Sequence, residues 1–100
     1  MDNRLVISGT LGNAPETRYS PAGIPITRFT LRHESIQQEA GMQRQAICNI
    51  AVIASGKQWL ETTKALQSGQ QIRVSGFLSR ANNRQGENRL ILHAEQIELL

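Results

Sequence analysis

Aromatic residues, lysine and cysteine are scarce in this sequence, and it has no long apolar run. Its 100 residues include 4% aromatics, which are Tyr19, Phe29, Trp59 and Phe77. No apolar run approaches the roughly 20 residues of a membrane helix, so no such helix is expected. The amino-terminal Met-Asp-Asn-Arg lacks the basic segment and apolar stretch of a secretory signal. We therefore expect a cytosolic protein with no membrane partner.

The single cysteine excludes an intrachain disulfide, which also fits a reducing compartment. Cys48, His33 and His93 are scattered, whereas a structural zinc site usually needs four close ligands. We expect no metal and no cofactor, and we interpret Cys48 as a small core residue and both histidines as satisfied or solvent-facing strand residues. No nucleophile–base pair, carboxylate pair or phosphate-cradling glycine loop is present, which argues against an enzyme.

Length and charge indicate one small globular domain, residues 1–100, with a mild basic excess. At 11.1 kDa and 39% hydrophobic residues the chain can bury one modest core. The net charge is +3, and nine of the eleven basic residues are arginine. Arginine presents a planar charged fork that suits phosphate and stacks on bases. Scattered arginines can also serve solubility alone, and charge by itself does not choose between these interpretations.

Period-two alternation dominates the sequence and predicts five β-strands. In the second strand, Phe29 and Leu31 share one face, while Arg28 and Arg32 share a wet, positively charged face. In the third strand the opening positions of the more polar row, around Ile47, face solvent. The predicted strands cover residues 3–11, 26–36, 45–54, 71–79 and 90–99.

The segments between these strands contain turn, loop and helix signals. Residues 12–23 break the alternation and end in Ser-Pro-Ala-Gly, which favours a type I turn. Residues 37–43 predict a polar loop. A capping-box spacing from Ser55 to Gln58 and an apolar face predict a short helix over 57–67.

Trp59 begins the apolar face of that helix. It is either a packing residue or a platform for a nucleobase, and its apolar neighbours favour packing. Three strands, a short helix and two strands form the element order of an all-β, five-stranded Greek-key OB-fold barrel, with the helix between strands 3 and 4. In that fold the second and third strands and two long loops form the binding face.

Four segments resemble known proteins. Asn-Arg-Leu-Val-Ile-Ser-Gly-Thr-Leu-Gly from Asn3 and Gly-Gln-Gln-Ile-Arg-Val-Ser-Gly-Phe-Leu from Gly69 resemble bacterial single-stranded DNA-binding proteins. Arg-His-Glu-Ser-Ile-Gln-Gln-Glu-Ala-Gly from Arg32 and Leu-His-Ala-Glu-Gln-Ile-Glu-Leu from Leu92 resemble the primosomal replication protein N family. The resemblance spans essentially the whole chain.

This resemblance implies a homodimeric adaptor of replication restart that binds single-stranded DNA and contacts the restart helicase and, through it, primosome loader proteins. Carried over by position, the family's basic DNA-contacting sites match Arg18, Arg84 and Arg89, and Arg44 matches a basic position near the third strand. Arg80 is an additional cation, and Ile47 should project into the binding face. The predicted DNA-binding residues are Arg18, Arg44, Ile47, Arg80, Arg84 and Arg89.

The chain departs from the family at four positions. Ile47 stands where the family can carry Trp, Met42 where it can carry Phe, Glu34 where it can carry Arg, and Asn82 where it can carry Lys. Stacking is worth roughly 1–3 kcal/mol per base, so these departures predict weaker DNA binding. The alternative for Ile47 is simple packing at a dimer rim.

The leading interpretation is a non-enzymatic DNA-binding adaptor with an electrostatic grip on phosphates. One alternative is a true single-stranded DNA-binding protein. Such proteins usually carry a long tail with acidic and aromatic residues, and no such tail is seen after Glu98. Another is a protein-interaction module with only weak DNA binding, which the low aromatic content favours.

Overall fold

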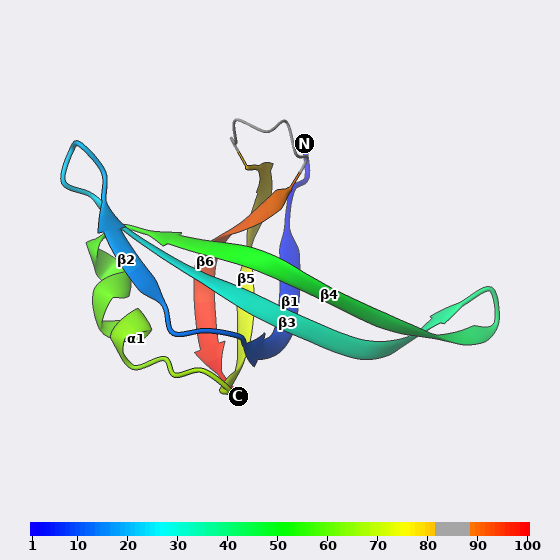
Figure 1. The fold of residues 1–100 in the computed structure, drawn as a ribbon. Coiled ribbons are helices and arrows are strands. Elements are labelled where there is room, and N and C mark those ends of the chain that lie inside the picture. The colour runs from blue at the N-terminus through cyan, green and yellow to red at the C-terminus, as the bar shows by residue number, and fades with distance from the viewer. Residues whose placement is uncertain (82–88) are drawn as a thin grey trace.

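The alternating segments form a sheet that closes on itself. The computed structural model describes residues 1–81 and 89–100. Its strands follow the order β1–β5–β6–β4–β3–β2, and β1 also pairs with β3, which closes a five-stranded barrel (Figure 1). The all-β barrel predicted from the sequence is therefore confirmed. The strands are β1 (Leu5–Leu11), β2 (Glu16–Tyr19), β3 (Pro25–Glu39), β4 (Met42–Ser55), β5 (Gln71–Arg80) and β6 (Leu90–Leu99).

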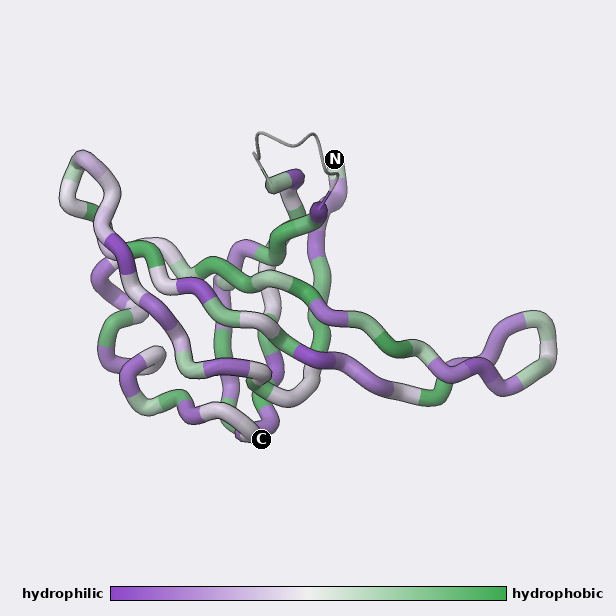
Figure 2. Tube along the Cα trace, viewed as in Figure 1, coloured by the Kyte–Doolittle hydropathy of each residue, from purple (hydrophilic) through white to green (hydrophobic). Residues whose placement is uncertain are grey.

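One row of each barrel strand fills the core. Phe29 and Leu31 of β3 are fully buried against Val52 of β4, Ile72 of β5 and Leu92 of β6. Successive strand residues point to opposite faces, so the neighbours of Phe29 and Leu31 along β3, such as Thr30, face solvent. Figure 2 shows the resulting alternation of hydrophobic and hydrophilic residues along the barrel strands. Burying one such large side chain contributes about 1.5–3 kcal/mol.

The strand β2 is not predicted from the sequence, because it lies inside the segment predicted to be a break and a turn. Thr17 pairs with Thr27 of β3, and their hydroxyls are 2.8 Å apart. All four β2 residues are exposed, so the strand shows no hydrophobic alternation. The turn after it is confirmed, because the amide of Gly23 donates to the carbonyl of Ser20 at 2.8 Å. Counting β2, the helical segment lies between β4 and β5, one strand later than predicted.

The polar loop predicted over residues 37–43 is wrong, because β3 and β4 continue through it. Only Ala40 and Gly41 form the turn, and both have positive φ, 53° and 76°. Positive φ at both central residues suits the twist of a two-residue hairpin. In the described chain, residues 34–47 find strand partners only within this hairpin. We call this segment the arm, and it extends well beyond the barrel (Figure 1).

The helical segment is shorter than predicted. It consists of the 3₁₀ turn η1 (Lys57–Trp59) and the helix α1 (Leu60–Lys64). The capping box is absent: Gly56, with φ 116°, precedes η1 without a side-chain cap. The predicted apolar face is confirmed where Thr63 and Leu66 are buried, and the Thr63 hydroxyl donates to the carbonyl of Trp59 at 2.7 Å.

The interpretation of Cys48 as a core residue is wrong, since its thiol is free and exposed. Its row does alternate with the outward row, as predicted. Cys48 pairs with His33 near the base of the arm, outside the part of β4 that pairs with β6. The same alternation therefore buries Val52 and exposes Cys48.

Candidate nucleic-acid interface

Side chains on the solvent side of β2, β3 and β4 form one continuous surface, which we call the outer face. Directly opposed residues in an antiparallel pair lie on the same side of a sheet. Glu16 opposes Arg28, and Arg28 opposes Ile53, so the surface crosses three strands at this level. The outer face carries Glu16, Arg18, Ile26, Arg28, Thr30, Arg32, Glu34, Ile47, Asn49, Ala51 and Ile53, of which Ile53 is buried, at 9% exposure.

Arginine supplies the positive charge of the outer face. Arg18, Arg28 and Arg32 are all exposed. Arg18 and Arg28 line one hollow between β2 and β3, and Arg32 lies four residues along β3 from Arg28. The two ion pairs of the described chain join other residues, so these three guanidinium groups have no carboxylate partner within it. An arginine in that state can offer its full fork to a phosphate.

The arm carries exposed aliphatic side chains. Ile47 is 53% exposed and lies opposite Glu34, whose carboxylate accepts from the Gln45 side-chain amide at 3.0 Å. Strand alternation places Met42 and Arg44 on the other side of the arm. Arg44 donates to Glu39 at 3.1 Å. The structure therefore places Ile47 on the outer face as predicted, but it does not bring Arg44 onto that face.

The remaining predicted cations belong to the hairpin between β5 and β6. Arg80 ends β5 opposite Leu90, and the amide of Ala81 donates to the carbonyl of Arg89 at 2.7 Å. Arg80 and Arg89 thus lie at the foot of this hairpin rather than among the outer-face strands. Arg84, like the departure at Asn82, falls outside the described residues.

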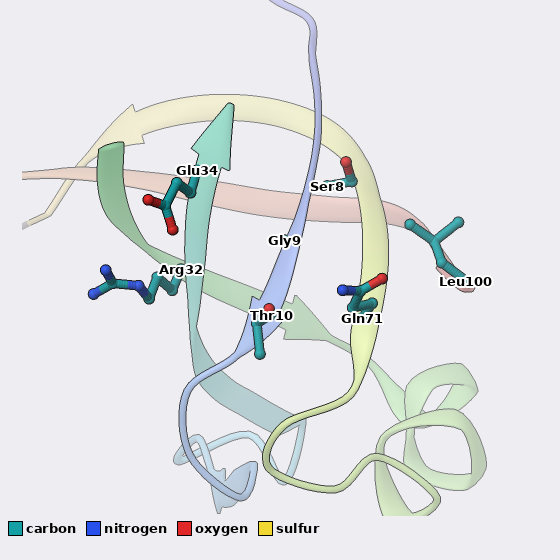
Figure 3. A pocket seen from close by; sticks show the side chains of 7 residues that line it. All are labelled: Ser8, Gly9, Thr10, Arg32, Glu34, Gln71 and Leu100. Atoms are coloured by element: carbon teal, nitrogen blue, oxygen red, sulfur yellow. The ribbon is translucent and has the colours of Figure 1, made fainter. Parts of the chain in front are cut away.

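A polar cleft opens where β1 separates from β3. Gly9 lies at a close approach of the two strands, where a Cβ would overlap the carbonyl oxygen of Arg32. His33 holds the strands together through Nδ1, 2.6 Å from the carbonyl oxygen of Ser8. Figure 3 shows Arg32 and Glu34 projecting from the same side of β3. The cleft is lined by Ser8, Gly9, Thr10, Arg32, Glu34, Gln71 and Leu100.

Neither histidine is available as a free ligand. His33 Nε2 lies 2.7 Å from the Ser35 hydroxyl, and His93 Nε2 lies 2.6 Å from the Ser79 hydroxyl. The prediction of satisfied strand histidines is confirmed. Over residues 1–81 and 89–100 no group of three histidine, cysteine or acidic residues gathers to hold a metal ion. No helix in those ranges is long and apolar enough to span a membrane.

Comparisons with known proteins agree with this geometry. Residues 3–96 match a family described as "Another single-strand binding protein family". The Replication restart protein PriB of Photorhabdus laumondii is 52% identical over 98 residues, covering 98% of this chain and 93% of that protein. PriB of Escherichia coli is 47% identical over 100 residues, covering 100% and 96%. The chain belongs to the PriB family of replication restart proteins.

Solved structures place this PriB-family chain among OB folds. PriB from Ralstonia solanacearum superimposes with a TM-score of 0.82 at 27% identity, covering 100% of both chains. The single-stranded DNA binding protein from Thermus aquaticus superimposes with a TM-score of 0.80 at 30% identity, covering 99% of this chain and 50% of that one. The resemblance noted from the sequence and the OB fold are both confirmed.

Two arginines of this PriB-family chain were missed as candidate site residues. Arg28 and Arg32 were recognised on a positively charged strand face, but transfer of the family's positions did not include them. The signal that finds them is the alternation itself, because Phe29 and Leu31 are fully buried between them. Their two positive charges on the outer face outweigh the negative charge of Glu34, which lies further along the same strand.

Proposed function

We propose that this chain is a non-enzymatic adaptor of replication restart that binds single-stranded DNA along its outer face. The observation that carries the proposal is the set of arginines, Arg18, Arg28 and Arg32, that have no ion-pair partner within residues 1–81 and 89–100 and lie on the strands that form the binding face in OB folds. Phosphates would lie on these guanidinium groups, and Ile47 on the arm would supply apolar contact. Membership of the PriB family supports the biological setting.

The family resemblance further suggests contacts with the restart helicase and primosome loader proteins, and a homodimer. The dimer proposal rests on β1: its residues 5–9 pair with β5 on one edge, whereas pairing with β3 begins only at Thr10. An open strand edge invites pairing with another strand. A second copy placed about a two-fold axis would close both edges. Sedimentation at tens of micromolar protein should show a dimer, and a monomer there would contradict this proposal.

The experiment that tests DNA binding is a titration of labelled single strands of several lengths, with a duplex of equal length as comparison. Arginine–phosphate contacts release counterions, with a slope of about −0.7 per phosphate in log affinity against log salt for single strands. The three outer-face arginines alone contribute about −2 to this slope, and contacts from Arg84 and Arg89 would make it steeper. Affinity that ignores salt would contradict the proposed mode.

A second candidate function is a protein-interaction module with only weak DNA binding. The exposed aliphatic residues of the arm favour it, since Ile36, Met42 and Ile47 are 61%, 71% and 53% exposed. Aliphatic side chains suit a protein partner better than the flat face of a base. In the same titration, this function predicts single-strand affinity no higher than that for the duplex.

A further inference from the structure

A row of side chains extends the outer face beyond the strands that carry the arginines. Ile53 of β4 is in register with His93 of β6, and His93 opposes Phe77 of β5. Arg28 opposes Ile53 on the other side. A cation, an aliphatic residue and an aromatic pair thus lie at one level across β3, β4, β6 and β5, although Arg28 and Phe77, at the ends of the row, are 49 positions apart in sequence.

The far end of this row is an aromatic pocket. The rings of Phe77 and His93 are stacked, with centroids 4.7 Å apart and planes 6° from parallel. Phe77 is nevertheless 41% exposed, so its ring does not complete a core. Trp59 of η1 lines the same hollow, together with the polar side chains of Gln58 and Glu95. The full lining is Ile53, Ser55, Gln58, Trp59, Phe77, His93, Ala94 and Glu95.

We propose that this pocket, which we call the aromatic pocket, accepts a nucleobase of single-stranded DNA. This inference rests on the proposed function, because the strand would reach the pocket from the phosphate positions near Arg28. A base is flat and apolar on its face and carries hydrogen-bonding groups on its edge. Phe77 and Trp59 provide aromatic surface for the face, and Gln58 and Glu95 provide donor and acceptor groups for the edge.

The position of the pocket explains how this chain can bind bases with an aliphatic arm. Ile47 offers no π-face, and Met42 lies on the opposite side of the arm. The three aromatic residues outside the core are Tyr19, Trp59 and Phe77, and two of these line one pocket. Stacking would therefore take place on the barrel, with β6 and β4 lying between Phe77 and Arg28, rather than on the arm.

Trp59 is the chain's only tryptophan, so its fluorescence reports on the pocket without a label. The probe is an oligo-dT strand, and the comparison is a strand of equal length built from abasic sugar–phosphate units. The dT strand should quench Trp59 emission, and the abasic strand should not. Both strands should show the same salt slope, because they carry the same phosphates.

Two variants make the test specific. Phe77→Leu should weaken dT binding about fivefold to a hundredfold, while binding of the abasic strand stays unchanged. Phe77→Tyr keeps the ring and should bind dT like the original chain. If Phe77→Leu does not fold, the quenching comparison on the unmodified chain still decides the matter.

The outcomes separate this inference from the function beneath it. Equal affinity for dT and abasic strands, with salt dependence and no quenching, would overturn the pocket and leave the DNA-binding proposal standing. No binding of dT at any salt concentration would overturn both. Trp59 emission that changes with protein concentration alone would assign the pocket to a second copy of the chain instead.

Discussion

Replacing both Arg28 and Arg32 with glutamine should weaken single-strand binding in a way that depends on salt. Each arginine on the outer face is taken to neutralise one phosphate, so losing two should make the slope of log affinity against log salt about 1.4 less negative. Between 50 and 200 mM salt, the loss of affinity by the double variant should therefore be about sevenfold smaller than that of the original chain. Arg28 and Arg32 are exposed and have no carboxylate partner in the described chain, so the fold should persist.

The assay is fluorescence anisotropy of a labelled dT strand at 50, 100 and 200 mM salt, with thermal unfolding as a check on the fold. Arg73→Gln is the matched control, because Arg73 is half-exposed on β5 and donates to Glu98 at 3.4 Å. It should leave the slope unchanged. A double variant that keeps the original slope would refute the assignment of phosphates to the outer face.

Three further changes are informative. Ile47→Trp should strengthen single-strand binding about fivefold or more, almost independently of salt, because it adds a π-face at an exposed strand position; a lower melting temperature with flat affinity would instead identify Ile47 as a packing residue. Arg84→Gln combined with Arg89→Gln should make the salt slope about 1.4 less negative, and an unchanged slope would remove that hairpin from the interface. Gly76→Ala should abolish cooperative unfolding in a thermal melt, because its Cβ would overlap the carbonyl oxygen of His93, and a normal melt would contradict this packing.

Where one side of a strand is buried, the sequence pattern alone predicts both the strand and the side that faces the core. Phe29 and Leu31 alternate with Arg28 and Arg32, and a strand must bury the first pair to expose the second. The same alternation along β5 accounts for the burial of Ile72 and Val74. The family resemblance was likewise readable from the chain alone, through segments such as Leu-His-Ala-Glu-Gln-Ile-Glu-Leu near the end.

Hydrophobic alternation cannot predict a strand that has no buried face. The four residues of β2 are exposed, and residues 37–43 at the end of the arm are exposed on both sides, so neither segment shows a hydrophobic period. At Cys48, alternation predicts a buried residue where the structure has an exposed one. Its alternation is that of a core residue, but the barrel does not extend far enough to cover it.

The candidate site depends on contacts that only the tertiary structure decides. Alternation indicates which residues of one strand share a side. It does not show that Arg28, Ile53, His93 and Phe77 lie next to one another across four strands. That level is set by the register of four strands, including the parallel pairing of β4 with β6. Register follows from packing of the inner rows, because a slip of one residue would turn a core row toward solvent. The local sequence thus determines which side of each strand is buried, and closure of the barrel brings an arginine and an aromatic pair onto one surface.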